Sequence, residues 1–217
     1  VYTILVSLVV GSLSARYLGP SNYGLISYGG AFISFFLIVT QLGMGNVIVL
    51  ELVRDENKTS TYLGTALIMR LLVSIGSLFL IYGIVVLLEP DNKLLHVVTL
   101  LQALSIVFQS SDVLYYWFQA KMEMKYVTLT GMISLTLTSI WRIILLIQNA
   151  SVAWFAVSAS ISALISGIAI SFFYINKAKT MLRFSIADAK YILANSYHFM
   201  INSVTMTFYT QLDKIMI

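Results

Sequence analysis

The stretch QLGMGNVIVLELVRDENKTSTYLGTALIMRLL, residues 41–72, sets the organisation of the chain. An uncharged apolar run ends at Leu50, a short charged turn follows, and a second apolar run starts at Tyr62. Arg70 lies about nine residues inside this second run, roughly 13 Å along a helix axis. A cation at that depth in a bilayer is costly unless it faces water or a partner, so we predict a functional role for Arg70.

The composition excludes several classes of protein. Hydrophobic residues make up 59% of the chain and charged residues only 10%, which excludes an ordinary soluble surface. The absence of cysteine excludes a disulfide-stapled domain and a thiolate metal site. No cluster of histidine, aspartate or glutamate has metal-site spacing, and no glycine-rich phosphate loop follows a strand, so we expect no metal and no cofactor. The basic residues interrupt apolar runs instead of sharing one face, so nucleic acid is not an expected partner.

Six apolar runs in the first 175 residues are each long enough to cross a bilayer, which takes about 20 residues. They cover residues 1–17, 23–50, 62–88, 94–118, 126–148 and 152–175. A polar connection follows at 176–190, and a seventh span starts at 191. The predicted fold is an all-α, polytopic integral membrane helix bundle. Because the chain begins without methionine and stops within an apolar run, we expect the first span to be truncated and the chain to be a fragment.

The basic residues gather in alternate turns. The turns after spans two, four and six contain eight cations: Arg54, Lys58, Lys121, Lys125, Lys177, Lys179, Arg183 and Lys190. The turns after spans one, three and five contain only Lys93, with Arg16 at a span end. The positive-inside rule therefore predicts that the even-numbered turns and the N-terminus lie in the cytoplasm.

Several charges lie within the predicted spans or at their ends: Arg70, Asp112, Arg142, Asp213 and Lys214, with Arg16 and Glu51 close to span ends. One interpretation is that these charges pair internally, Arg70 or Arg142 with Asp112, and only fix the register of the helices. A single pair would suffice for that purpose, and three arginines exceed what two aspartates can neutralise. We therefore favour a hydrated cavity that accepts an anion, and the planar fork of arginine suits a phosphate group.

Four stretches resemble the polysaccharide-biosynthesis flippases, the Wzx-type O-antigen transporters. In chain order they are Arg16-Tyr17-Leu18-Gly19-Pro20 with Tyr23-Gly24 (RxLGPxxYG), Gly64-Thr65-Ala66 with Arg70 (GTAxxxR), Asp112 with Trp117-Phe118-Gln119 and Lys125-Tyr126 (D…WFQxxxxxKY), and Tyr209 with Asp213 and Ile215-Met216 (YxxxDxIM). The four matches follow one another in the same order as in that family and cover nearly the whole chain.

The resemblance implies the multidrug/oligosaccharidyl-lipid/polysaccharide exporter superfamily, in which two six-helix lobes enclose a central cavity and transport proceeds by alternating access. Residues 1–175 would be the first lobe of this MATE-like transporter of twelve or more helices, 176–190 a cytoplasmic connection, and 191–217 the start of the second lobe. The implied function is that of a flippase, not an enzyme. It would move undecaprenyl-pyrophosphate-linked oligosaccharide across the bacterial inner membrane for O-antigen and lipopolysaccharide synthesis. Membrane lipids are expected partners, and a polysaccharide polymerase and other assembly proteins are candidate partners.

The resemblance and the buried charges together suggest roles for individual residues. Arg16, Arg70 and Arg142 would line the cavity and bind the substrate diphosphate. Three further residues would act as counter-ions or in proton coupling: Asp112, Asp213 and Lys214. The main alternative is a drug or cation antiporter of the same superfamily, although such a site should favour acidic residues. A membrane enzyme would need a catalytic histidine or a carboxylate cluster, and the number of buried charges argues against a purely structural subunit.

Overall fold

The computed structural model of the chain describes the backbone of residues 2–215 and the side chains of residues 2–202 and 205. Its helices are α1 (Tyr2–Gln41), α2 (Met44–Arg54), η1 (Glu56–Lys58), α3 (Thr59–Leu88), α4 (Lys93–Phe108), η2 (Gln109–Asp112), α5 (Val113–Ala120), α6 (Met124–Ile147), α7 (Val152–Ala178) and α8 (Ile186–Ile215). No strand occurs in the described backbone.

Five stretches are long and apolar enough to cross a membrane: Tyr2–Arg54, Glu56–Leu88, Lys93–Ala120, Met124–Ile147 and Val152–Ala178. The prediction of an all-α polytopic membrane protein is confirmed.

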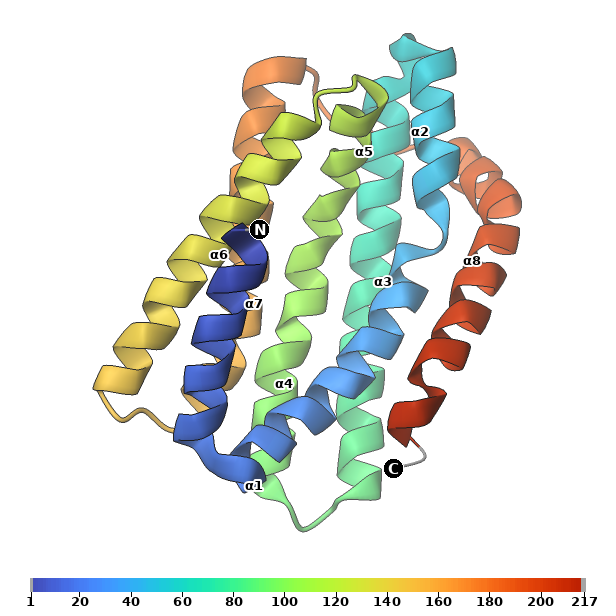
Figure 1. The fold of residues 1–217 in the computed structure, drawn as a ribbon. Helices are drawn as coiled ribbons and strands as arrows, with labels where there is room; N and C mark the ends of the chain where they lie inside the picture. Colours follow the sequence, from blue (N-terminus) through green and yellow to red (C-terminus); the bar gives the residue numbers. More distant parts are fainter. Residues whose placement is uncertain (1, 216–217) are drawn as a thin grey trace.

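The first of these five stretches contains two of the predicted spans. The chain turns back at Gly19, which has φ 70° and ψ 171°, a conformation that is strained for any residue with a side chain. Pro20 then starts the second arm, where its fixed φ fits a first helical turn and its missing N–H costs nothing. The two arms of α1 diverge from this bend at the lower end of the molecule (Figure 1). The predicted break at residues 18–22 is therefore confirmed.

The predicted span 94–118 contains a break that we did not anticipate. It is divided into α4, the short 3₁₀ helix η2 and α5. Ser110 donates a hydrogen bond from its Oγ to Ser74 Oγ on α3, at 3.2 Å. On the other side, a Cβ placed on Gly167 of α7 would lie 3.2 Å from Ser111 Oγ, so this glycine allows α7 to approach the break closely. A 3₁₀ turn inside a long helix often marks a functional hinge.

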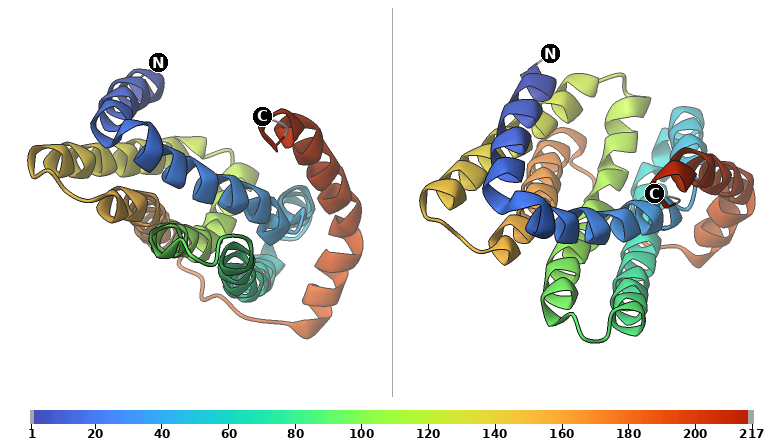
Figure 2. Two further views of the ribbon diagram at one scale, coloured as in Figure 1. Left: turned by 90° about the horizontal axis from the view of Figure 1, so that it is seen from below. Right: turned by 60° about the horizontal axis from the view of Figure 1, so that its bottom comes forward.

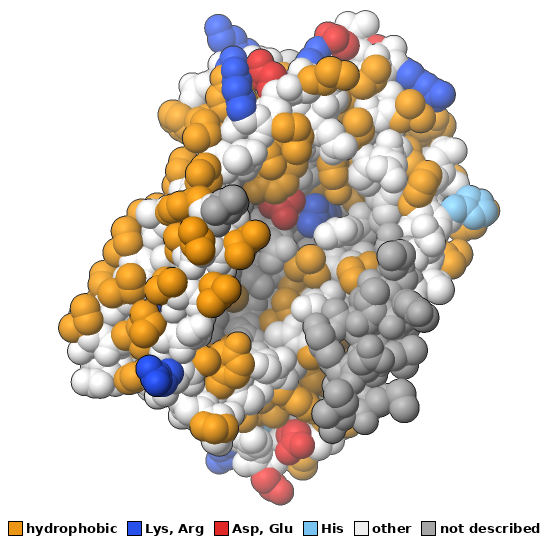
Figure 3. All heavy atoms as spheres, viewed as in Figure 1, with side chains coloured by type: hydrophobic (Ala, Val, Ile, Leu, Met, Phe, Trp, Pro, Cys, Tyr) orange, Lys and Arg blue, Asp and Glu red, His pale blue; other side chains and the backbone are white. Residues whose placement is uncertain are grey.

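The turns lie at two ends of the bundle (Figure 1). The α2–α3, α5–α6 and α7–α8 connections lie at the upper end, and the Gly19 bend with the α3–α4 and α6–α7 loops lies at the lower end. Figure 3 shows basic side chains at the upper end and mainly apolar side chains along the flank. The alternation read from the sequence therefore corresponds to a basic end and an opposite end of the same bundle.

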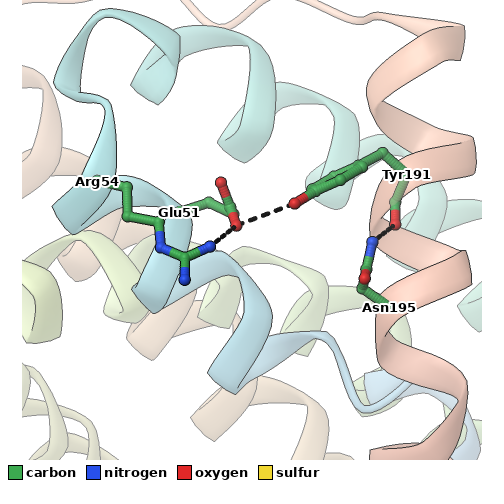
Figure 4. A network of polar contacts seen from close by, with 4 residues as sticks. All are labelled: Glu51, Arg54, Tyr191 and Asn195. Atoms are coloured by element: carbon green, nitrogen blue, oxygen red, sulfur yellow. Dashed lines mark hydrogen bonds and ion pairs between the residues drawn. The ribbon is translucent and has the colours of Figure 1, made fainter.

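Helix α8 is attached to α2 near the basic end (Figure 4). The carboxylate oxygen Oε1 of Glu51 accepts hydrogen bonds from Arg54 Nη1 at 3.2 Å and from the Tyr191 hydroxyl at 3.1 Å. Below this contact, a Cβ added to Gly43 would lie 2.5 Å from the backbone nitrogen of Met200, so the two backbones touch. Helix α8, which holds the predicted seventh span, is not among the five membrane-span candidates found in the described residues. The division into two lobes at residues 176–190 stays a prediction.

The connection between α7 and α8 is short, because α7 continues to Ala178 and α8 begins at Ile186. We call its non-helical part, residues 179–185, the strap. The strap lies on the first turns of α3: the Arg183 N–H donates to the Ser60 carbonyl at 3.0 Å and the Ser185 N–H donates to Thr65 Oγ1 at 3.0 Å. Ser60 Oγ also donates to the carbonyl of Met181. These bonds satisfy backbone groups that would otherwise need water.

Gly64 makes the docking of the strap possible, because an added Cβ would lie 2.3 Å from the carbonyl oxygen of Arg183. We expect Gly64→Ala to lower the free energy of unfolding by about 1–3 kcal/mol, since backbone would have to move. Gly83 on the same helix is the matched control, because nothing lies within 4 Å of its added Cβ. There the alanine should be neutral or stabilising by about 0.5–1 kcal/mol. Thermal unfolding of the two variants in detergent would measure the difference, and equal stabilities would contradict the prediction.

Candidate functional site: an arginine–aspartate pair beside a polar cavity

The break in the fourth span brings an acidic side chain next to Arg70. The Nη2 of Arg70 on α3 lies 3.9 Å from Oδ2 of Asp112 at the end of η2. The Arg70 side chain is 3% exposed and the Asp112 side chain 25% exposed. Charge-assisted N–H···O bonds are usually about 2.7–2.9 Å long, so this pair is in contact without a close hydrogen bond. The internal pairing of Arg70 with Asp112, one of the two interpretations of the charges in the sequence, is therefore present in a loose form.

Arg70 retains unused hydrogen-bonding capacity. Its Nε is buried and has no hydrogen-bond partner among the described residues. A guanidinium has five N–H donors and cannot lose its proton in a protein, so an incompletely bonded buried arginine is costly. An anion that reached Arg70 could accept the hydrogen bonds that Asp112 leaves unmade. The site therefore has the chemistry to bind an anion.

A cavity of about 560 Å³ lies on the other side of Asp112. It is bounded by the first turns of α1, the η2 break, α6 and α7, and its walls carry mainly small and hydroxyl side chains: Thr3, Ser7, Thr128, Ser134, Ser162 and Ser166. Tyr115 also lines it, with its hydroxyl 2.6 Å from Ser166 Oγ. Figure 3 shows the hollow in this face, with acidic and basic side chains meeting at its upper end.

The polar lining was only partly predicted from the sequence. Ser158, Ser162 and Ser166 are spaced four residues apart in a ridge on α7, a pattern typical of close helix packing, and two of them, Ser162 and Ser166, line the cavity. Ser134 on α6 bonds to the carbonyl of Ser162 at 2.7 Å, so the ridge both packs against α6 and supplies hydroxyl groups. The polar run Gln109-Ser110-Ser111-Asp112 inside an apolar span was the signal for the break and for this cavity.

Comparison with known proteins gives a family for the chain. The family model described as polysaccharide biosynthesis protein matches residues 1–217. The chain belongs to the polysaccharide biosynthesis protein family. Neither the curated proteins nor the solved structures that were searched gave a match. Members of this family are transporters and not enzymes, so the chain is a multi-pass membrane protein with a transport role in polysaccharide synthesis.

The three arginines predicted as cavity cations lie at different depths in this polysaccharide biosynthesis protein. Arg16 is exposed, roughly 5 Å above the Gly19 bend, and Arg142 is half-buried, roughly 8 Å from the lower end of α6. Arg70 lies much closer to the basic end, roughly 27 Å from the lower end of α3. Neither Arg16 nor Arg142 makes an ion pair with a described carboxylate. The arginines therefore do not form one cluster, and their role in substrate binding stays a prediction.

Of the other predicted site residues, only Asp112 is placed by the structure. Asp112 contacts Arg70 and lines the cavity, which fits the counter-ion role. Asp213 and Lys214 lie on α8 with side chains outside the described residues. No group of three or more metal-ligating side chains occurs among the described residues. Arg70 and Asp112 are accordingly the core of the candidate site.

Proposed function

We propose that this polysaccharide biosynthesis protein is a flippase that moves undecaprenyl-pyrophosphate-linked oligosaccharide across the bacterial inner membrane, with its N-terminus in the cytoplasm. The head group of such a substrate carries a diphosphate that cannot cross hydrocarbon unaided. The lipid tail can stay in the bilayer throughout. The protein must therefore provide a polar route with cations along it, and alternating access would open that route to one side at a time.

The observation that supports this proposal most strongly is the state of Arg70. It is buried at the level of a helix break, contacts its carboxylate partner only at 3.9 Å, and has an unbonded Nε. A diphosphate could replace the Asp112 carboxylate and bind the guanidinium fork through two oxygens. Asp112 would hold Arg70 in place between transport cycles. In this mechanism the diphosphate exchanges with the Asp112 carboxylate, so the guanidinium of Arg70 always has an anionic partner in the membrane.

The different depths of the arginines support a route with successive contacts. A diphosphate bound at Arg70 would lie roughly 20 Å along the bundle from Arg16 and Arg142, by helical rise. These two arginines would meet the head group only near the opposite end. Weak binding at several positions favours movement, because a single tight site would retain the substrate.

The second candidate is a drug or cation antiporter. It is favoured by one specific observation, namely that Asp112 is the charged residue among those lining the described cavity. A carboxylate surrounded by hydroxyl groups can attract an organic cation. Transport assays with the full-length protein in liposomes separate the two candidates. Uptake of ethidium without movement of fluorescently labelled lipid-linked oligosaccharide would favour the antiporter, and the reverse result would favour the flippase.

The proposed orientation can be tested with single cysteines, because the chain contains none of its own. Lys93 and Lys125 are both exposed and lie at opposite ends of the bundle. We expect a membrane-impermeant maleimide to label Lys93→Cys in intact spheroplasts and to label Lys125→Cys only after the membrane is opened. The two sites serve as controls for each other. Labelling of Lys125→Cys in intact spheroplasts would reverse the proposed orientation.

A further inference from the structure

Two cavities on the outer side of the fourth span join into one groove. One has a volume of about 610 Å³ and the other about 650 Å³. Both are lined by Leu67 of α3 and by Ser171 and Ile175 of α7, so they adjoin each other at these three residues. The groove therefore runs between α3 and α7, and Ser110 and Ser111 of η2 line its deeper end. We call it the α3–α7 groove.

The α3–α7 groove opens away from the polar cavity. Seen from below, α3, α4 and α7 lie on the side of the bundle opposite the two arms of α1 (Figure 2). The side chains along the groove are large, apolar and partly exposed, among them Leu71, Ile168 and Phe172. In a multi-pass membrane protein such a face contacts the hydrocarbon of the bilayer. Lipid chains are therefore the molecules that this groove meets.

The length of the groove matches one leaflet. The part that would hold an acyl chain, below the strap, is lined on α7 from Leu164 to Ile175, roughly 16 Å at the helical rise. Half of a hydrocarbon core about 30 Å thick is about 15 Å. The deeper end lies at the break in the fourth span, and the shallow end lies at the strap, which is at the basic end of the bundle. A chain in this groove would span the leaflet on the basic side.

The shallow end carries groups that suit a phosphate. Lys179 lines the groove there, is exposed, and makes no ion pair with a described carboxylate. Thr180 lies next to it with its hydroxyl 3.0 Å from the Tyr174 hydroxyl. Nearby Lys177 contacts Glu123 at 3.8 Å, so that cation is already compensated. Basic pockets between transmembrane helices on the cytoplasmic side commonly bind acidic lipid head groups.

We propose that the α3–α7 groove is a binding site for an anionic phospholipid of the leaflet at the basic end. One acyl chain lies in the groove between α3 and α7, and the phosphate of the head group binds Lys179. The isoprenoid chain of the proposed cargo is much longer than one leaflet, so the length of the groove favours a phospholipid. Such a lipid would lie against the outer side of η2, whose inner side carries Asp112.

The site can be tested by native mass spectrometry of the full-length protein released from nanodiscs. The probes are phosphatidylglycerol, phosphatidylethanolamine and undecaprenyl phosphate, offered at equal amounts. Lys179→Gln removes the cation at the shallow end, and Lys125→Gln is its control because Lys125 is also an exposed lysine at the basic end. Leu71→Trp fills the groove, and Leu72→Trp is its control because the neighbouring Leu72 lines none of the described cavities.

We expect the wild-type protein to retain phosphatidylglycerol in preference to the other two lipids. Lys179→Gln should weaken that retention about fivefold, the effect of one lysine near an anionic lipid. Leu71→Trp should weaken retention of phosphatidylglycerol and phosphatidylethanolamine alike, while both control variants should behave as wild type. Equal loss in the groove variants and their controls, or equal retention of the two phospholipids, would overturn the proposal. Preferential retention of undecaprenyl phosphate would overturn it in favour of a site for the tail of the cargo.

Discussion

Arg70→Met is expected to reduce transport of lipid-linked oligosaccharide by about a hundredfold, because losing a buried charge-assisted contact to an anion costs about 2–5 kcal/mol. Methionine keeps most of the volume of the arginine stem, so the packing around α3 is largely preserved. The measurement is the rate at which the full-length protein, reconstituted in liposomes, exposes a fluorescent lipid-linked oligosaccharide. Arg54→Met is the matched control. Arg54 is 62% exposed and contacts Glu51, so its loss should change transport and stability little.

A structural role for Arg70 would give a different result in the double variant. Arg70→Met alone leaves Asp112 without its cation, and an unsatisfied buried group of this kind costs about 1–3 kcal/mol. Adding Asp112→Asn removes the leftover charge, and replacing both members of a buried ion pair is often neutral for stability. We therefore expect the double variant to recover most of its stability while transport stays lost. Recovery of transport together with stability would show that the pair only holds the helices in register.

Most of the fold could be predicted from the sequence because its determinants are local. Apolar runs of bilayer length, the Gly19-Pro20 bend and the alternating basic turns each depend on a few consecutive residues. The break at η2 and the strap docked on α3 depend instead on contacts between segments far apart in the chain, such as Ser74 with Ser110 and Thr65 with Ser185. A polar run inside a span indicates that something is unusual there, but not which helix it will meet.

The candidate site shows the same limit. The sequence predicted that Arg70 and Asp112 matter, because isolated charges in apolar spans are costly wherever they lie. It assigned Arg16, Arg70 and Arg142 to one cavity, but Arg16 and Arg142 lie near the lower ends of α1's first arm and α6, far along the bundle from Arg70. The sequence also placed Gly64-Thr65 in a family motif without a structural explanation for either residue. The structure gives one: Gly64 admits the strap carbonyl of Arg183, and Thr65 bonds Ser185.

Asp112→Asn is expected to destabilise the substrate-free protein and to increase its response to substrate. Arg70 would lose its carboxylate and cannot lose its proton, which costs up to about 3 kcal/mol. A diphosphate would then bind the guanidinium without displacing a competing carboxylate. Thermal unfolding of the full-length protein with and without undecaprenyl pyrophosphate would measure both effects. Without ligand the variant should unfold at a lower temperature than wild type. Undecaprenyl pyrophosphate should then raise the unfolding temperature of the variant more than that of wild type.

The control for this prediction is Glu56→Gln, which removes a carboxylate that contacts Lys121 at 2.6 Å on the exposed surface. It should change neither the unfolding temperature nor its rise with undecaprenyl pyrophosphate appreciably.

The antiporter interpretation makes the opposite prediction for Asp112→Asn. If Asp112 binds an organic cation, the variant loses ethidium transport and gains no extra stabilisation from a diphosphate. In a flippase the Asp112 carboxylate competes with the diphosphate for Arg70, so Asp112→Asn strengthens substrate binding. In an antiporter the same carboxylate binds the organic cation, so Asp112→Asn abolishes substrate binding. A variant that responds to undecaprenyl pyrophosphate no more than wild type would mean that Arg70 does not bind the head group.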